Sequence, residues 1–331
     1  MTNLKKLSTF IIGIGLLGTY PLEIRAQNVA NPPALKTTGS KSNTENPVKT
    51  RHKTVVINGI KIFYREAGSP DAPTILLLHG FPSSSRMYNT LITSLADRFH
   101  LIAPDYPGFG NSDTPPASKF KYTFDHIAEI VDQFTMAIGL QKYSLFLQDY
   151  GGPIGMRLAI AHPERVTSII IQNAVSHEEG LSPLWEKRRA YWKDRAANEP
   201  ALMKSLTSPE ATKQRHIGTN PHPELIDPDT WNDELTWINK PGELEIQLDL
   251  FYDYQNNVAS YPKYQTYLRK YQPPMLVVWG KYDPSFTTAG AEAYKKEIPG
   301  CEIHILDAGH FALDDNTAEI DRYIRAFFDR L

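Results

Sequence analysis

Cysteine is nearly absent from the 331-residue sequence, which contains only Cys301. A single thiol excludes an intramolecular disulfide framework, and Cys301 has no partner at metal-ligand spacing. Neither sign of charge dominates, since 35 Lys and Arg stand against 37 Asp and Glu and the net charge is −2. This balance gives no general electrostatic reason to bind nucleic acid. We therefore expect no nucleic-acid partner, no metal and no cofactor.

A long apolar run near the N-terminus is also missing. The run from Leu7 to Gly18 has about 12 residues, fewer than the roughly 20 that a membrane-spanning helix needs. Lys5 and Lys6 precede it and the small residue Ala26 follows, a pattern that predicts an export signal over residues 1–26. We expect a secreted or periplasmic protein without stable membrane insertion, a retained anchor being the alternative. Residues 27–50 are polar and Pro-rich, which predicts a flexible linker.

From residue 51 onward, strand-like and helix-like segments alternate. Asn58-Gly59 is a strong hairpin signal between the first two strand-like runs. Short apolar runs such as Thr74–Leu78 are typical of parallel strands buried on both faces, and Phe124 to Leu140 has apolar residues at helical spacing. The expected strands are 54–57, 60–65, 74–78, 101–103, 143–147, 166–171, 275–278 and 302–306, and the other expected helices are 154–161, 290–296 and 318–331.

The alternation stops between residues 175 and 268. This stretch contains no convincing buried strand but many Trp, Tyr, Arg and Pro residues, which indicates a helical insertion. The whole pattern predicts an α/β protein, with a mostly parallel twisted sheet and helices on both faces. We expect its core at residues 51–174 and 269–331. Residues 175–268, called the cap here, are expected to form a lid over the carboxyl ends of the strands.

The most informative stretch runs from Leu145 to Gly155. A buried strand leads into Asp149, and small residues follow before a helix, which is the arrangement of a nucleophile elbow. The usual small residue two positions before the nucleophile is Leu147 here. Taken alone, Asp149 could instead cap the following helix, because Asp is common at that position.

Two further segments favour a catalytic role for Asp149. Asp283 follows the strand at 275–278 and His310 follows the last strand, so that nucleophile, acid and base stand in the chain order of a hydrolase triad. The segment His79-Gly-Phe-Pro follows the strand at 74–78, where an oxyanion-hole loop belongs. The backbone N–H groups of Phe81 and Tyr150 would then point at one developing negative charge.

These motifs resemble those of a known family. HGFP at 79–82, APDYPGFGNSD at 103–113, QDYGG at 148–152 and DAGHF at 307–311 resemble the α/β-hydrolase superfamily, and within it the epoxide hydrolase and haloalkane dehalogenase branch. The resemblance covers residues 54–331 and implies the α/β-hydrolase fold with an inserted helical cap. Some relatives keep the triad acid at the position of Asn173, and its absence there supports Asp283.

An aspartate nucleophile implies a particular chemistry. An ionised carboxylate needs no base to attack an sp³ carbon, and the product is an alkyl–enzyme ester. His310 then acts as the general base for the water that hydrolyses the ester, and Asp283 orients His310. We therefore expect a hydrolase of electrophilic carbon rather than an ordinary esterase, although a carbonyl-directed enzyme with Asp149 as scaffolding stays open.

The leaving group separates the two branches of the family. Dehalogenases typically hold the halide with a Trp directly after the nucleophile and with an Asn in the HGxP loop or a second Trp, but Tyr150 and Phe81 occupy those positions here. Epoxide hydrolases protonate the epoxide oxygen from two lid tyrosines, and the resemblance assigns this role to Tyr254 and Tyr191. Cap packing is the alternative for both tyrosines.

The expected function is therefore an epoxide hydrolase that gives vicinal diols. A haloalkane dehalogenase is the first alternative, and a non-catalytic binding protein of the same fold is the second, although an intact triad argues against it. The expected partner is a small lipophilic epoxide or halide substrate, because the cap is rich in large apolar and aromatic side chains. These side chains are Trp185, Trp192, Phe251 and Tyr264.

Overall fold

The computed structural model describes residues 49–331. The predicted export signal and nearly all of the predicted linker lie outside these residues. Eight strands form one sheet in the order β1-β2-β4-β3-β5-β6-β7-β8. The strands are β1 (Arg51–Ile57), β2 (Ile60–Ala67), β3 (Thr74–Leu78), β4 (His100–Pro104), β5 (Tyr143–Gln148), β6 (Val166–Gln172), β7 (Met275–Gly280) and β8 (Glu302–Leu306).

Only the first strands break the parallel pattern of the sheet. β1 pairs antiparallel with β2, and β2 pairs antiparallel with β4, whereas all later pairs are parallel. The predicted hairpin closes at Asn58 and Gly59, whose φ angles of 51° and 81° are those that a tight two-residue turn requires. The prediction of a mostly parallel α/β sheet is confirmed.

Alternate residues of the central strands pack into two separate cores. Leu76 and Leu78 of β3 belong to the core on the side of α2 and α3. Ile75 and Leu77 belong to the core on the side of α1 and α10, because successive side chains of a strand point to opposite faces. The helices are α1 (Asn89–Leu95), α2 (Phe124–Ala137), α3 (Gly151–Ala161), α4 (Trp185–Lys193), α5 (Arg195–Thr207), α6 (Pro209–Ile217), α7 (Asp229–Ile238), α8 (Glu243–Tyr271), α9 (Thr288–Ala293) and α10 (Ala312–Phe328).

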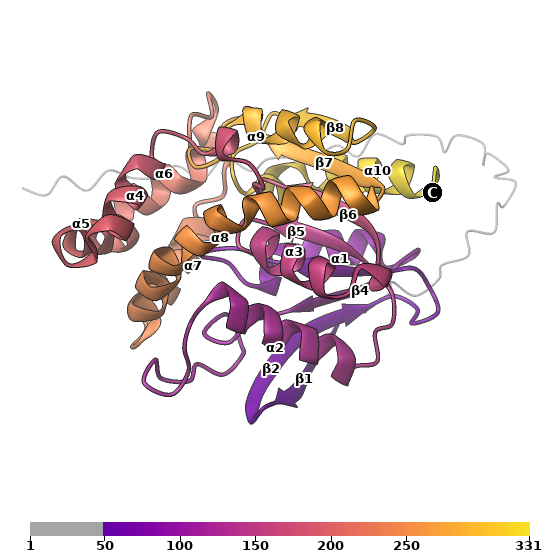
Figure 1. Ribbon diagram of the computed structural model, residues 1–331, viewed down its shortest axis with the longest axis horizontal. Helices are drawn as coiled ribbons and strands as arrows, with labels where there is room; N and C mark the ends of the chain where they lie inside the picture. Colours follow the sequence, from indigo (N-terminus) through magenta and orange to yellow (C-terminus); the bar gives the residue numbers. More distant parts are fainter. Residues whose placement is uncertain (1–48) are drawn as a thin grey trace, which may run out of the picture. The chain divides into compact units, whose positions relative to one another are not determined.

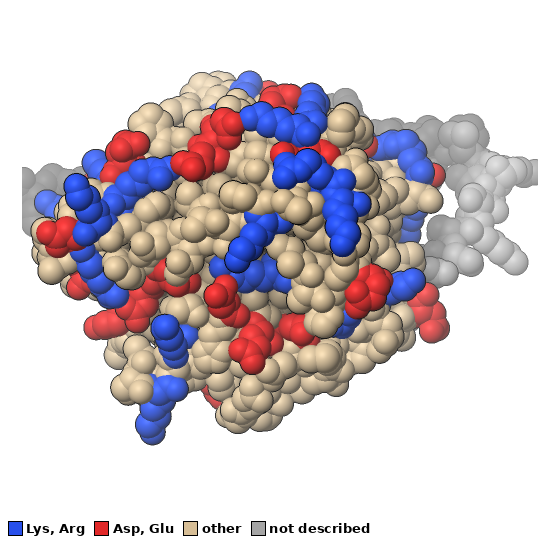
Figure 2. Space-filling view, in the orientation of Figure 1, with Lys and Arg blue, Asp and Glu red and all other residues tan. Residues whose placement is uncertain are grey.

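The segment between β6 and β7 carries helices α4 to α8. Figure 1 shows α4 to α7 beyond one end of the sheet, while α8 runs from them back across the core. At 29 residues, α8 is long enough to serve both the cap and the core. No helix of residues 49–331 is both long and apolar enough to cross a membrane. Acidic and basic side chains are interspersed over the face seen in Figure 2, as the balanced composition suggests.

The last helix differs from its prediction. It begins at Ala312 rather than at residue 318, and Asn316 interrupts it with non-helical angles. Asp314 and Asp315 give this first turn a loop-like sequence. Their carboxylates nevertheless suit the positive end of the helix dipole, and Ala312 and Leu313 bury apolar side chains against the sheet.

The unusual Leu147 fits because α3 provides space for it. Leu147 of β5 is fully buried, and a Cβ atom added to Gly155 of α3 would lie 2.2 Å from its Cδ2 atom. Gly155 on the helix thus provides the space that a small residue on the strand would otherwise provide. This exchange keeps β5 and α3 at the close separation that the turn between them needs.

We expect Gly155→Ala to destabilise the protein by about 1–3 kcal/mol, because the added methyl group overpacks the core. Urea unfolding measures the change, with Gly300→Ala as the control, since no atom lies within 4 Å of a Cβ added at Gly300. In a Leu147→Ala background the added methyl group has room. Its destabilising effect should then nearly vanish, and an undiminished effect would contradict the proposed contact.

Candidate active site

Asp149 occupies the sharp turn between β5 and α3. Its φ angle of 47° is in the left-handed region, which non-glycine residues occupy mainly where the surroundings force it. Gly151 permits the turn, because a Cβ atom there would lie 1.9 Å from the carbonyl oxygen of Leu78. Asp149 does not cap α3: Tyr150 occupies the N-cap position, and no side chain caps the helix. The carboxylate is instead turned toward the loop that follows β3.

Two backbone N–H groups point at the Asp149 carboxylate. The amide of Phe81 donates to Oδ1 over 2.8 Å, and the amide of Tyr150 also donates to the carboxylate. The loop approaches so closely that a Cβ atom on Gly80 would lie 2.2 Å from the Cβ of Asp149. These are the two amides that the sequence predicted for an oxyanion hole, and the structure brings both to the same carboxyl group.

His310 lies between the two predicted aspartates. Its Nδ1 atom is 2.7 Å from Oδ2 of Asp283, and its Nε2 atom is 3.6 Å from Oδ2 of Asp149. Asp283 is fixed in turn, because its Oδ1 atom accepts hydrogen bonds from the backbone amides of Ser285 and Phe286. All three side chains are buried. The imidazole is thus oriented on one side and faces the Asp149 carboxylate on the other.

Burial and charge set the protonation of this group. Burial raises the pKa of Asp149 above its ordinary value, and the charge of His310 and the amides of Phe81 and Tyr150 oppose that rise. Burial also acts to lower the pKa of His310, but the carboxylates of Asp283 and Asp149 outweigh it and raise the pKa above 6.5. The two carboxylates thus stabilise the imidazolium form of His310 against the effect of burial.

Three buried amide side chains surround the group. Asn173, at the end of β6, donates from Nδ2 to Oδ2 of Asp283 over 2.8 Å. Gln148 lies with Nε2 3.0 Å from Nε2 of His310, and Gln172 donates to the backbone oxygen of His310 over 2.8 Å. Sequence reasoning did not single out either glutamine, although a polar residue at the end of a buried strand was the available signal. Together the amides fix the positions of His310 and Asp283.

The two predicted tyrosines lie in different surroundings. Tyr254 of α8 is buried beside Tyr150, with ring centroids 6.1 Å apart. Burial raises the pKa of Tyr254 well above 10, and the nearby Tyr261 and the Asp149 carboxylate raise it further. The hydroxyl therefore keeps its proton near Asp149.

Tyr191 of α4 is not brought to this group. Its hydroxyl lies 3.1 Å from the backbone oxygen of Leu248 and 3.1 Å from Oε2 of Glu199. Both atoms accept hydrogen bonds, so the single hydroxyl proton is already shared between partners within the cap.

Aromatic rings cover the Asp149 side of the site. Phe81 packs edge-on against Phe251 with ring centroids 5.0 Å apart. The ring centroids of Trp185 and Tyr254 are 4.6 Å apart. The indole N–H groups of the nearby tryptophans already bind backbone oxygens. Trp185 donates to Ser285, Trp192 to Phe251 and Trp279 to Phe286.

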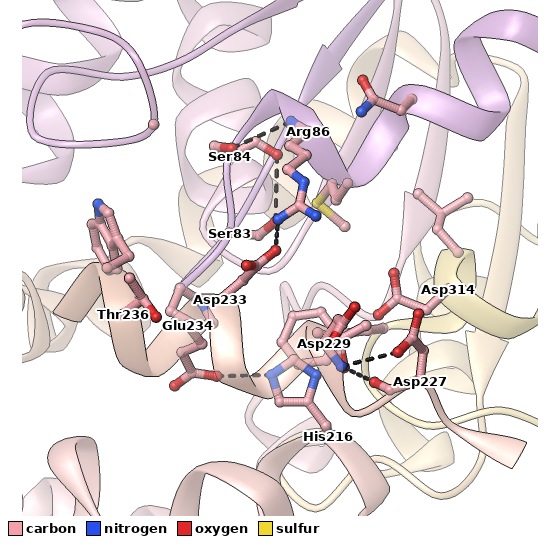
Figure 3. A pocket seen from close by; sticks show the side chains of 18 of the residues that line it. Ser83, Ser84, Arg86, His216, Asp227, Asp229, Asp233, Glu234, Thr236 and Asp314 are labelled. Carbon is pink, nitrogen blue, oxygen red and sulfur yellow. Dashed lines mark hydrogen bonds and ion pairs between the residues drawn. The ribbon is translucent and has the colours of Figure 1, made fainter. Parts of the chain in front are cut away.

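A cavity of ≈ 550 Å³ with a mixed polar and apolar lining lies beside the site. Its lining includes Pro82, His216 and Phe311, and His216 stacks on Phe311 with centroids 4.3 Å apart. Figure 3 shows Arg86 of the core meeting Asp233 of the cap across this cavity, where the two form an ion pair. The other labelled side chains are Ser83, Ser84, His216, Asp227, Asp229, Glu234, Thr236 and Asp314.

Comparison with known proteins fits this architecture. The model of the alpha/beta hydrolase fold family matches residues 73–317. An uncharacterized hydrolase of Saccharomyces cerevisiae is 41% identical over 283 residues, which cover 84% of this chain and 96% of the yeast protein. The chain therefore belongs to the alpha/beta hydrolase fold family, and it is a hydrolase.

More distant relatives have named activities. A haloalkane dehalogenase of Psychrobacter cryohalolentis is 26% identical, over 81% of this chain and 87% of its own length. The solved structure of the epoxide hydrolase CorEH without ligand superposes with a TM-score of 0.68 at 18% identity, covering 85% of this chain and 99% of that chain. The second likeness concerns the fold alone.

The contact between Asp283 and His310 makes a testable prediction. In Asp283→Asn the negative charge is lost, so the pKa of His310 should fall, since burial then acts with less opposition. NMR titration of the imidazole nitrogens measures this, with His310→Gln to assign the signal. Asp307→Asn is the control, because Asp307 is an exposed carboxylate paired with Lys281 at 2.6 Å. An unchanged His310 titration in Asp283→Asn would show that the two residues are not coupled.

Proposed function

We propose that the protein hydrolyses an electrophilic sp³ carbon by way of a covalent ester on Asp149, and that its substrate is an epoxide. The observation that carries the proposal is the carboxylate at the apex of the β5–α3 turn, with His310 3.6 Å behind it. A serine or cysteine there would attack a carbonyl carbon after losing a proton. An ionised aspartate attacks carbon directly.

The first step forms the ester. One Asp149 oxygen attacks an epoxide carbon, the ring C–O bond breaks, and the ring oxygen takes a proton from Tyr254. Because the pKa of Tyr254 is well above 10, the phenol donates its proton only to a strongly basic oxygen such as the opening ring provides. Tyr254 is buried among the rings of Phe124, Tyr150 and Trp185. This burial limits access of water, which would otherwise compete as the donor.

The second step releases the diol. Neutral His310 takes a proton from a water molecule, whose oxygen attacks the ester carbonyl of Asp149. Negative charge then develops on the carbonyl oxygen that faces the amides of Phe81 and Tyr150. Asp283 stabilises the imidazolium that forms. The tetrahedral intermediate expels the alkoxide, which takes the second proton of the added water and leaves as the vicinal diol, while the proton on His310 restores Tyr254.

A haloalkane is the second candidate substrate, because relatives named haloalkane dehalogenases share most of the chain. A departing halide needs N–H donors around it. The indole groups of Trp185, Trp192 and Trp279 already bind backbone oxygens, and the residue after Asp149 is Tyr150. The arrangement therefore favours an epoxide oxygen, which needs a proton, over a halide.

The covalent step is tested by trapping. His310→Gln should form the ester from styrene oxide but fail to hydrolyse it, so that intact mass rises by the mass of one substrate. Asp149→Asn should show neither the mass increase nor diol. In a single turnover of the native enzyme in ¹⁸O-water, the first diol should carry unlabelled oxygen from Asp149. Labelled diol in that turnover would show that water attacks the epoxide directly.

The proton donor is tested by comparing the two tyrosines. Tyr254→Phe should slow diol formation from styrene oxide by about 10²-fold or more, the usual contribution of a general acid. Tyr191→Phe should leave the rate nearly unchanged, since its hydroxyl is bound within the cap. An equal loss of rate in both variants would indicate that Tyr191 also donates a proton to the epoxide oxygen. Halide release from a bromoalkane without diol formation from any epoxide would favour the dehalogenase.

A further inference from the structure

The cap places two guanidinium groups over the aromatic side of the site. The Cζ atom of Arg188 in α4 lies 4.0 Å from the ring centroid of Phe251. The Cζ atom of Arg215 in α6 lies 5.4 Å from the ring centroid of Phe81. Since these two rings are in edge-on contact 5.0 Å apart, both cations border the aromatic pair that covers Asp149.

The two arginines differ in their partners. Arg215 forms an ion pair with Glu234, a buried residue of α7 that also holds His216 at 2.8 Å. Within residues 49–331, Arg188 forms no ion pair and no side-chain hydrogen bond. The next residue, Arg189, faces outward and binds Glu178 at 2.7 Å. Arg188 is therefore a cation with an aromatic ring on one side and no anion of its own.

The position of Arg188 is electrostatically costly. Its pKa is lowered to about 10, chiefly by burial and also by the charge of Arg215, whereas Tyr150 and the Asp149 carboxylate act in the opposite direction. The guanidinium thus stays protonated at neutral pH, where removal from water without a partner is unfavourable. The residue nevertheless keeps some exposure to solvent.

Asp149 does not serve as that missing anion. Its Oδ1 atom accepts from the amide of Phe81, its Oδ2 atom faces His310, and no ion pair joins it to Arg188. A guanidinium that lies over a ring still presents its N–H groups in its own plane. That planar fork matches a carboxylate, which can accept two parallel hydrogen bonds.

We propose that Arg188 binds a carboxylate carried by the substrate, so that the enzyme acts on anionic rather than purely lipophilic molecules. The apolar part of such a substrate would lie against Phe251 and Trp185, with the reacting carbon at Asp149. The identity of the reacting group rests on the function proposed above. The recognition of the carboxylate rests only on Arg188 and its surroundings, and it can be measured without any reaction.

The test uses two unreactive probes of the same shape, 3-phenylpropanoate and 3-phenylpropanamide. Calorimetry should show that the native enzyme binds the carboxylate at least about tenfold more tightly than the amide, the effect of one charge-assisted hydrogen bond. Arg188→Met should abolish this preference, since methionine keeps the apolar stem and loses the charge. Arg189→Met should retain it, and thermal unfolding checks that both variants fold.

The chemistry is tested separately with 3-phenylglycidate and its amide as substrates. A preference for the carboxylate probe without conversion of either epoxide would support the role of Arg188 and contradict the proposed epoxide hydrolysis. Equal affinity for the two probes would overturn the role of Arg188 whatever the activity. An unchanged preference for the carboxylate in Arg188→Met would also overturn that role. The same holds if neither probe binds to the native enzyme at millimolar concentration.

Discussion

The Asp149 carboxylate is held where two loops meet at a distance that only glycine permits. Gly80 and Gly151 leave space that any Cβ atom would fill, and the resulting approach allows the amides of Phe81 and Tyr150 to reach one carboxyl group. The strained φ angle of Asp149 is maintained by this contact. Every catalytic step proposed for the protein depends on that turn, since it aims the carboxylate away from α3 and toward the loop that follows β3.

Several charged side chains of the site are also buried or partly buried. Asp149 and Asp283 share His310 between them, while the cap adds Arg188 and Arg215 on the other side. Such groups are costly to bury unless they are paired and hydrogen bonded. The amide side chains around His310 supply the hydrogen bonds on the core side. On the cap side one cation is left for a ligand to neutralise.

The core of the site could be predicted from the sequence because its geometry follows from topology. Asp149, Asp283 and His310 each come after a parallel strand, and the carboxyl ends of such strands meet at one edge of the sheet. The cap could be predicted as helical but not in orientation. Arg188 and Tyr191 are three residues apart and share one face of α4, so helix spacing alone does not tell which of them lies nearer to the active site. That choice is made by packing between helices, which no local pattern encodes.

The long helix α8 is anchored to the core as well as to the cap. Arg157 of α3 binds Asn257 at 2.8 Å and Tyr264 at 2.5 Å, and this ties the middle of α8 to the helix that follows Asp149. Tyr254, one turn earlier, is thereby positioned from the core. Helices α4 to α7 can consequently change in length or shape while Tyr254 stays in register with Asp149. The residues proposed for substrate selection and those proposed for bond breaking would thus lie on separate segments of the chain.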